Sequence, residues 1–428
     1  MFRNFICACF FVQILCLDLT LFAQVREQIR MSQIATVQLY GYGDQQSFPL
    51  MTLNGNDRLQ LNFDDLEGNV KSYYYTYVLC DYNWKPVNLS PFDYIKGFTQ
   101  IRISNYRVSS IALTRYTHYQ AILPDKDCLP TRSGNYLLKV YLDGDTNKLA
   151  FVKQLVVMNP QCAILGEVVQ PFTPDKFKTH QKIRFSVALK GINSFSAAQQ
   201  VKVVVLQNNR WDIAQRDIAP TFVRGNSLEY NADQIAVFAA GKEWRWADLR
   251  NFRLQSDRVE KAIYGKRSTE VFMKPDRDRT GDRYIFFPDL DGTYRITTFE
   301  SINPFWQGDY ATVNFYFKPE SGQPFSRDLY LSGQFTGFQK TDSWRMKFDE
   351  STGLYTCAAY LKQGYYNYSY LFDPAECGTA CPDLEGNYWE TENMYTILVY
   401  YKSFTDRCDQ LIGAATINSR NDRPGMSF

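Results

Sequence analysis

Histidine is almost absent from this chain of 428 residues, which contains only His118 and His180. Two histidines leave little room for a serine–histidine–aspartate triad or a histidine-ligated zinc site. The G-x-S-x-G, H-E-x-x-H and P-loop motifs are also missing from the sequence. We therefore expect a protein that is not an enzyme and needs no cofactor or metal. Both histidines lie beside expected strands, where we predict hydrogen-bonded structural roles.

An excess of one charge is missing too. The sequence has 47 basic and 45 acidic residues, a formal net charge of +2, and no long basic block. Proteins that bind phosphate backbones need clustered lysine and arginine, so nucleic acid is not an expected partner.

Long hydrophobic runs are missing as well, because no stretch reaches the ~20 apolar residues of a membrane-spanning helix. The N-terminal segment instead has one early cation, Arg3, then an apolar run and a small residue at Ala23. This is the layout of a secretory signal cleaved after Ala23. Cys16 offers lipid attachment as an alternative, but the residues before it fit a lipobox poorly. We predict that residues 1–23 are a signal peptide and that the mature chain is periplasmic or extracellular.

Cysteine is sparse once that signal is removed. Ten cysteines are present, and seven remain without Cys7, Cys9 and Cys16. An odd number leaves at least one thiol free or paired with another chain. Cys377 and Cys381 in "ECGTAC" are the closest pair, and a disulfide or free thiols fit them better than a metal, since zinc wants more cysteine or histidine ligands nearby.

Aromatic residues are abundant, at 16% of the chain with 30 Tyr and 31 Phe. This composition excludes disorder and favours strands. Alternation is clear where Leu59, Leu61 and Phe63 are separated by polar residues, which is the pattern of a half-buried strand. Many such short runs separated by turns predict an all-β protein made of tandem immunoglobulin-like β-sandwich domains.

Two loop-like segments divide the strand-rich sequence, "VMNPQCA" near residue 158 and "KPESGQPFSRD" near residue 320. They predict an N-terminal sandwich over 24–158, a middle β-rich domain over 159–320 and a C-terminal sandwich over 321–428. Residues 326–415, with "SGQF" and "GYYNYSYLF", resemble the early-set immunoglobulin-like modules found beside starch- and glycogen-active domains. That resemblance implies carbohydrate binding as an alternative function.

Paired carboxylates are the remaining candidates for chemistry. Asp64–Asp65 and Asp289–Asp291 have the residue types of a glycosidase, but acidic pairs are equally common in turns. The "DGDTN" stretch (143–147) begins like a calcium loop but lacks its glycine and its final glutamate. We interpret all three as turns.

The stretch "VKSYYYTYVLCDYNW" (70–84) raises the question of what so many rings do. Alternate rings within Tyr73–Tyr77 should pack a sandwich, and the others should lie on its outer face. The following loop, 81–98, carries Trp84, Phe92 and Tyr94 among prolines. We hypothesise that these three rings are exposed and bind a partner; the commoner alternative is a loop folded back as cover.

Five long segments carry a further resemblance: "VQLYGYGDQQSFPLMTLNGNDRLQLNFDDLEGNVKSYYYTYVLCDYNWKPVNLSPFDYIKGF", "SGNYLLKVYLDGD", "VKVVVLQNNRWD", "PTFVRGNSLEYN" and "LKQGYYNYSYLF…EGNYWETENMYTILVYY". Together they resemble the type IX secretion system plug proteins of the Bacteroidota. The resemblance runs from about Ile34 to Asn418, and Cys377 and Cys381 are not part of it. It implies a periplasmic protein that binds the outer-membrane β-barrel translocon from beneath and closes its periplasmic mouth while no cargo is engaged. No small-molecule substrate is implied. The alternative is a carbohydrate-binding periplasmic or surface β-sandwich protein.

Overall fold

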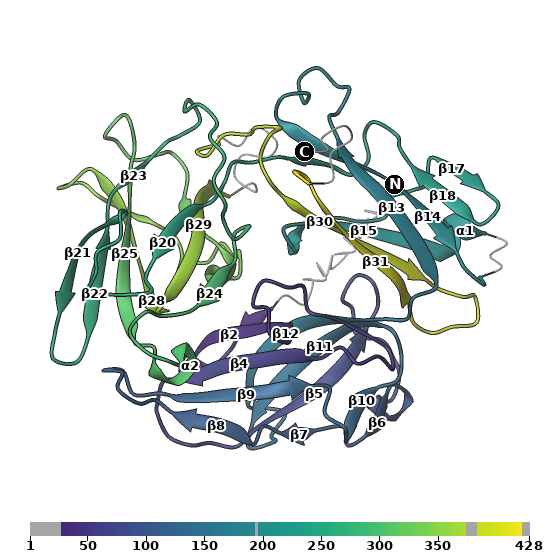
Figure 1. Ribbon diagram of the computed structural model, residues 1–428, viewed down its shortest axis with the longest axis horizontal. Helices are drawn as coiled ribbons and strands as arrows, with labels where there is room; N and C mark the ends of the chain where they lie inside the picture. The colour runs from purple at the N-terminus through teal and green to yellow at the C-terminus, as the bar shows by residue number, and fades with distance from the viewer. Residues whose placement is uncertain (1–26, 193–195, 374–382, 422–428) are drawn as a thin grey trace, which may run out of the picture.

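Nearly all regular structure in this protein is β-strand, as the sequence predicts. The computed structural model describes residues 27–192, 196–373 and 383–421. The predicted signal peptide, Cys377 and Cys381 therefore lie outside the described residues. Three sandwich units stand around a common centre (Figure 1). Among the described residues, no helix has the length and apolar character needed to cross a membrane.

The N-terminal unit, residues 27–159, is a sandwich of two antiparallel layers. One layer has the strand order β2-β4-β9-β8, and the other contains β12-β11-β5-β7. A core of large apolar residues, among them Phe63, Tyr73 and Phe151, lies between the layers. Its elements are β1 (Gln28–Ile29), β2 (Ile34–Gly41), β3 (Leu50–Thr52), β4 (Leu59–Asp65), β5 (Tyr73–Cys80), η1 (Pro91–Asp93), β6 (Ile95–Gly97), β7 (Ile101–Arg102), β8 (Asn105–Val108), β9 (Thr117–Leu123), β10 (Cys128–Pro130), β11 (Gly134–Leu142) and β12 (Leu149–Met158).

The aromatic strand β5 alternates as predicted. Tyr73, Tyr75 and Tyr77 are buried in the core of the N-terminal unit, while Tyr74 and Thr76 between them are half-buried on the outer face. Strand β4 differs from its half-buried expectation, because its polar face is buried as well. The reason is tertiary: that face is covered by another unit of the same chain, through the contacts described below.

The middle unit is built from two distant parts of the chain, residues 160–240 and 389–421. Its first layer has the order β13-β14-β18-β17, and its second layer contains β16-β15-β30-β31. Its elements are β13 (Cys162–Val169), β14 (His180–Leu189), α1 (Ala197–Gln200), β15 (Val201–Gln207), β16 (Arg210–Gln215), β17 (Phe222–Arg224), β18 (Ser227–Tyr230), β19 (Val237–Ala239), β30 (Met394–Tyr401) and β31 (Gln410–Asn418).

The inserted unit, residues 241–388, lies in the sequence between those two parts. Strands β20, β24 and β26 surround β29 in one layer, and β21-β22-β25-β28-β27 form the other. Its elements are β20 (Arg245–Asp248), β21 (Val259–Tyr264), β22 (Thr269–Met273), β23 (Asp276–Arg277), β24 (Tyr294–Ile296), α2 (Pro304–Gln307), β25 (Tyr310–Lys318), β26 (Leu329–Ser332), η2 (Gln334–Thr336), β27 (Lys347–Asp349), β28 (Leu354–Lys362) and β29 (Gly364–Phe372).

Strand pairing crosses the boundary that the sequence predicts at residue 320. Strand β25, before that boundary, pairs with β28 beyond it along eight residues. The C-terminal hairpin β30–β31 has residue numbers within 321–428, but it is part of the middle unit, because β30 pairs with β15. The stretch that resembles an early-set module is thus divided between two units. Local composition marks loops, but it does not say which strands pair across long separations.

The C-terminal hairpin also joins two units into one sheet. Strand β31 runs beside β12 in parallel at Met158 and Leu411, which makes a ten-stranded sheet that extends from β16 to β7. Figure 1 shows this hairpin, in yellow, between the N-terminal and middle units. One residue pair, Met158 with Leu411, joins the two units in this sheet, close to the point where the chain passes from one unit to the next.

Candidate functional site

The three rings predicted to bind a partner have different environments. Trp84 is 1% exposed and Tyr94 is 4% exposed, so the expectation that the loop exposes them is wrong for both residues. Tyr94 lies in the core of the N-terminal unit, 6.1 Å from the ring of Tyr136. Phe92 alone is on the surface, with 77% of the residue exposed. Whether any of the three contacts a partner protein stays a prediction.

Trp84 is buried because the chain turns back directly after β5. The side chain of Asp81 accepts hydrogen bonds from the backbone N–H groups of Asn83 and Lys85, and Trp84 adopts a left-handed φ of 66°. This turn directs the indole towards the middle unit, where it meets Trp211 edge to face with ring centroids 4.8 Å apart. An aspartate that bonds its own following backbone is a common turn signal, so "DYNW" contained a sign of the reversal.

The exposed part of the site is a rim of aromatic rings on two neighbouring loops. Phe92 and Phe98 flank β6 in the N-terminal unit, and Phe404 lies in the β30–β31 turn of the middle unit. Phe404 is 76% exposed. We call these three residues the aromatic rim. The sequence search did not identify Phe98 or Phe404, and single rings in short polar loops gave no pattern by which to find them.

Arg132 holds the two rim loops together. Its Nε donates to the carbonyl of Asp93, next to Phe92, and its Nη1 pairs with Asp406 at 3.2 Å, two residues from Phe404. Burial raises the pKa of Asp406. Hydrogen bonds from Gln410 and from the backbone, together with the charge of Arg132, outweigh burial and hold this pKa below its usual value. Figure 1 shows the yellow β30–β31 turn beside β6 and β10. The rim is therefore one surface built from two units.

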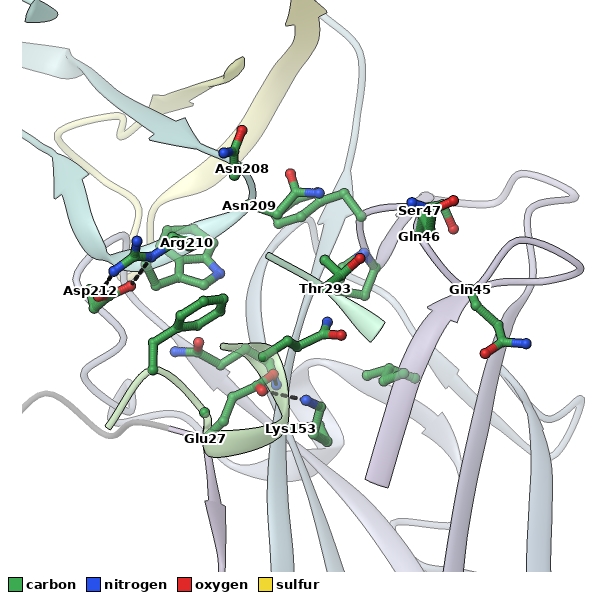
Figure 2. Close-up of a pocket in the computed structure, with 18 of the residues that line it drawn as sticks. Glu27, Gln45, Gln46, Ser47, Lys153, Asn208, Asn209, Arg210, Asp212 and Thr293 are labelled. Atoms are coloured by element: carbon green, nitrogen blue, oxygen red, sulfur yellow. Dashed lines mark hydrogen bonds and ion pairs between the residues drawn. The ribbon is translucent and has the colours of Figure 1, made fainter. Parts of the chain in front are cut away.

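A cavity of about 130 Å³ lies where the three units meet. Figure 2 shows Gln45–Ser47 and Lys153 from the N-terminal unit, Asn208–Asp212 from the middle unit and Thr293 from the inserted unit. The rings of Phe48, Trp211 and Phe338 also line it.

Most polar groups of this cavity already have partners in the protein. Gln45 both donates to and accepts from the backbone of Ile296, and Asn208 accepts from Met394 N–H. Arg210 pairs with Asp212 and lies over the ring of Phe338 at 4.5 Å. The contacts of Gln45 with Ile296 and of Arg210 with Phe338 cross unit boundaries and stabilise the junction, whereas the other two lie within the middle unit.

A buried ionic cluster joins β4 of the N-terminal unit to the inserted unit. Lys362 Nζ lies 2.5 Å from Asp64 Oδ2, the hydroxyl of Tyr310 donates to the same oxygen, and His118 Nδ1 lies 2.7 Å from Oδ1. The expected turn role of Asp64–Asp65 is therefore wrong, because both carboxylates belong to a buried strand. Asp65 instead accepts from the Tyr73 hydroxyl and pairs with Lys71.

The charges in this cluster shift one another's pKa values. Burial would raise the pKa of Asp64, but Lys362 and His118 together lower it below its usual value. Burial lowers the pKa of His118, and Asp64 offsets only part of that effect. Asp64 is thus ionised and His118 neutral at neutral pH. Such an arrangement holds the N-terminal and inserted units together.

The remaining predicted residues have structural surroundings. His118 and His180 are both hydrogen-bonded, His180 through its Nδ1 to the Thr179 hydroxyl at 2.8 Å, as predicted. The 143–147 stretch is the turn of the β11–β12 hairpin. The five cysteines of the described chain are free thiols. Asp289 and Asp291 lie in the loop and turn before β24, and they are taken up again below.

Comparison with known proteins points to one family. Residues 34–159, which are the N-terminal unit, match the family model described as "Type 9 secretion system plug protein 1st domain". No curated protein matches the chain. Among solved structures, a hypothetical protein from Parabacteroides merdae has 29% sequence identity and a TM-score of 0.87. The match covers 92% of this chain and 99% of that one. Residues 34–159 therefore match the first domain of the type 9 secretion system plug proteins, and this match supports that family for the chain.

Proposed function

We propose that this protein is the periplasmic plug subunit of a type IX secretion system. In this role it binds the outer-membrane β-barrel translocon and closes its periplasmic opening while no substrate is engaged. The observation that carries the proposal is the family match of residues 34–159. A plug component acts by obstruction, and His118 and Asp64 belong to the buried cluster that joins the N-terminal and inserted units.

The interlocked architecture supports an obstructing role. A stopper for a wide protein-conducting pore has to resist deformation, and three features oppose movement between these units. They are the ten-stranded sheet, the edge-to-face contact of Trp84 with Trp211, and the buried pair of Asp64 with Lys362. Rigid partners also lose less conformational entropy on binding than flexible ones.

The aromatic rim is the surface that we assign to translocon contact. Exposed aromatic rings provide much of the binding energy in protein interfaces, particularly when polar groups surround them. Phe92 and Phe404 are close in sequence to Asp93 and Asp406, the two residues that Arg132 contacts, which fits that description. Because the two loops belong to different units, binding there depends on the assembled fold.

Capture of the translocon tests the proposal. The tagged full-length protein is incubated with solubilised outer membranes, and the bound proteins are identified. We expect the wild-type protein to retain the translocon, and a Phe92→Ala/Phe404→Ala double variant to retain at least about tenfold less, the loss that 1.4 kcal/mol produces. The control is Phe172→Ala, which removes an equally exposed ring from the middle unit.

Loss of function gives a second readout. A strain without the gene should have an outer membrane more permeable to a large probe, and the wild-type gene should restore the barrier. An unchanged barrier, or no translocon bound by the wild-type protein, contradicts the proposal. Equal capture by the rim variant and the Phe172→Ala control moves the contact to another surface.

Carbohydrate binding is the second candidate function, and the junction cavity is the observation that favours it. Aromatic rings beside amide and charged side chains are typical of polar small-molecule sites. The contacts that already use most of those polar groups count against it. Retention on insoluble glucans, abolished by Trp211→Ala without any membrane partner, would support this candidate in place of the plug.

A further inference from the structure

Three carboxylates from two different units converge beside the junction of the middle and inserted units. Asp289 and Asp291 belong to the turn before β24, and Glu392 precedes β30. Each offers an oxygen, and these three oxygens lie within 4.8 Å of one another. Opposite ligands of a calcium ion are about 5 Å apart, since each bond is 2.3–2.6 Å long. Three oxygens in such a group can therefore face one cation.

Glu243 adds a fourth carboxylate that is almost completely buried. It is 1% exposed, and its Oε2 has no hydrogen-bond partner among the described residues, although Oε1 accepts from the Tyr284 hydroxyl at 2.5 Å. The same hydroxyl donates to the carbonyl of Glu390, which places this carboxylate beside the segment that carries Glu392. A buried carboxylate oxygen without a partner is costly, so Glu243 points to a missing ligand.

The backbone around Glu243 lies directly against the turn that carries the two aspartates. Trp244 N–H donates to Asp289 Oδ2 at 2.5 Å. Gly292 has a φ of 80°, and a Cβ at that position would come within 2.6 Å of the Trp244 ring. Glycine thus permits a close approach that holds the Asp289–Asp291 turn beside the residue following Glu243. A second buried oxygen here, Asp291 Oδ1, also has no partner.

Few positive charges compensate this group. Arg279 acts on Glu243, and Arg420 acts on Glu392. Arg279 is also paired with Glu385, so its charge is shared. Burial and the neighbouring carboxylates raise the pKa of Asp289 to about 7 and move the pKa of Asp291 upwards as well. Without a bound cation, these carboxylates repel one another, and the uptake of protons relieves that repulsion.

We propose that Asp289, Asp291 and Glu392 form a site for one divalent cation of the calcium type, with the buried carboxylate of Glu243 close by. All three ligands offer carboxylate oxygens, which calcium and magnesium prefer over the softer transition metals. Water fills the remaining coordination positions. Asp289 and Asp291 come from the inserted unit and Glu392 from the middle unit. The ion therefore joins these two units near the point where the chain returns from the inserted unit to the middle unit.

Direct binding to the full-length protein tests the site. Protein treated with EDTA is dialysed and titrated with CaCl₂ by calorimetry, and Tb³⁺ emission sensitised by the adjacent Trp244 reports occupancy. We expect one Ca²⁺ for each chain, and a midpoint of thermal unfolding about 3 °C or more higher with calcium than with EDTA. Asp291→Asn should weaken binding at least about tenfold, as loss of a ligand does.

The variant and its control make the outcome unambiguous. Asp291→Asn removes like-charge repulsion, so in EDTA it should be at least as thermostable as the wild type while losing the gain from calcium. Asp145→Asn, in the exposed β11–β12 turn, should bind calcium like the wild type. Absence of heat, of Tb³⁺ emission and of any thermal shift overturns the site and means that protons alone stabilise the cluster. Loss of binding in Asp145→Asn, with Asp291→Asn unaffected, also overturns it.

Discussion

The indole rings of Trp84 and Trp211 meet edge to face, at an interplanar angle of 88°, across the boundary between the N-terminal and middle units. Around them, side chains from both units form one shared core, which includes Val156, Val204 and Leu398. Arg216 of the middle unit lies over the Trp211 ring and donates to the carbonyl of Tyr82. Trp84, whose ring was hypothesised to bind another protein, thus packs against a second unit of its own chain.

Replacing Trp84 by alanine should therefore destabilise the fold instead of weakening a surface contact. We expect the free energy of unfolding to fall by about 3–5 kcal/mol, the usual loss for a buried tryptophan. Phe92→Ala, which truncates an exposed ring in the same loop, should change it by less than about 0.5 kcal/mol. Urea denaturation followed by circular dichroism measures both. Similar losses for the two variants would contradict the different environments of these rings.

Removing one charge of the buried Asp64–Lys362 pair should also lower the free energy of unfolding. Lys362→Met leaves Asp64 buried with its main cation gone, and we expect a loss of about 3–5 kcal/mol in the free energy of unfolding. The double variant Asp64→Asn/Lys362→Met should recover part of that loss, because no uncompensated charge remains. Lys148→Met removes the cation of an exposed pair, with Asp143, and serves as the control with a change below about 1 kcal/mol. A single variant as stable as this control would show that the pair is not buried in solution.

The buried histidine makes stability depend on pH. The pKa of His118 is lowered by burial, so below its ordinary value of about 6.5 the unfolded chain takes up a proton that the folded chain does not. Stability is then lost as the pH falls, by up to about 1.4 kcal/mol for each pH unit. Asp64, whose pKa is also lowered, adds to the loss at more acidic pH.

Unfolding free energies between pH 7 and 5.5 measure this effect, with His118→Gln as the comparison. Carboxylates with raised pKa values, such as Asp289, change stability in the opposite direction over this range. The difference between the slopes of wild type and variant removes their contribution. We expect the variant to have the less positive slope of stability against pH, and equal slopes would show that His118 is solvated or already protonated.

The sequence predicts local features of this protein better than its long-range pairing. Alternation in β5 predicted that every second side chain of Tyr73–Tyr77 is buried, because side-chain direction in a strand depends only on neighbouring residues. The pairing of β30 with β15, almost 200 positions apart, has no local signature. The same limit explains the site: Phe404 becomes part of a rim with Phe92 only after the C-terminal hairpin returns to the N-terminal unit.

Buried polar residues were hardest to interpret for a related reason. Asp64 has the alternating position of an outward-facing residue, and only the arrival of Lys362 makes that face interior. Asp291 lies in a turn, as predicted for the Asp289–Asp291 pair, but Glu243 and Glu392 approach the pair from elsewhere in the chain. A carboxylate pair in sequence therefore says little about its charge environment until the fold is known.

The last prediction concerns the reactivity of the cysteine thiols, both among the described residues and at Cys377 and Cys381 outside them. Burial raises the pKa of Cys80 and of Cys128 to about 12, and Cys162 and Cys357 are raised to about 11. Thiolate is the reactive form, so these cysteines should resist iodoacetamide at pH 8 in the native protein. After unfolding without reductant, five thiols should react if Cys377 and Cys381 are joined, and seven if they are free, once residues 1–23 are removed. We expect five, because a four-residue spacing in an oxidising compartment allows the pair to close. Mass spectrometry of the alkylated peptides distinguishes the two outcomes, and labelling of Cys80 or Cys128 in the native protein would contradict their burial.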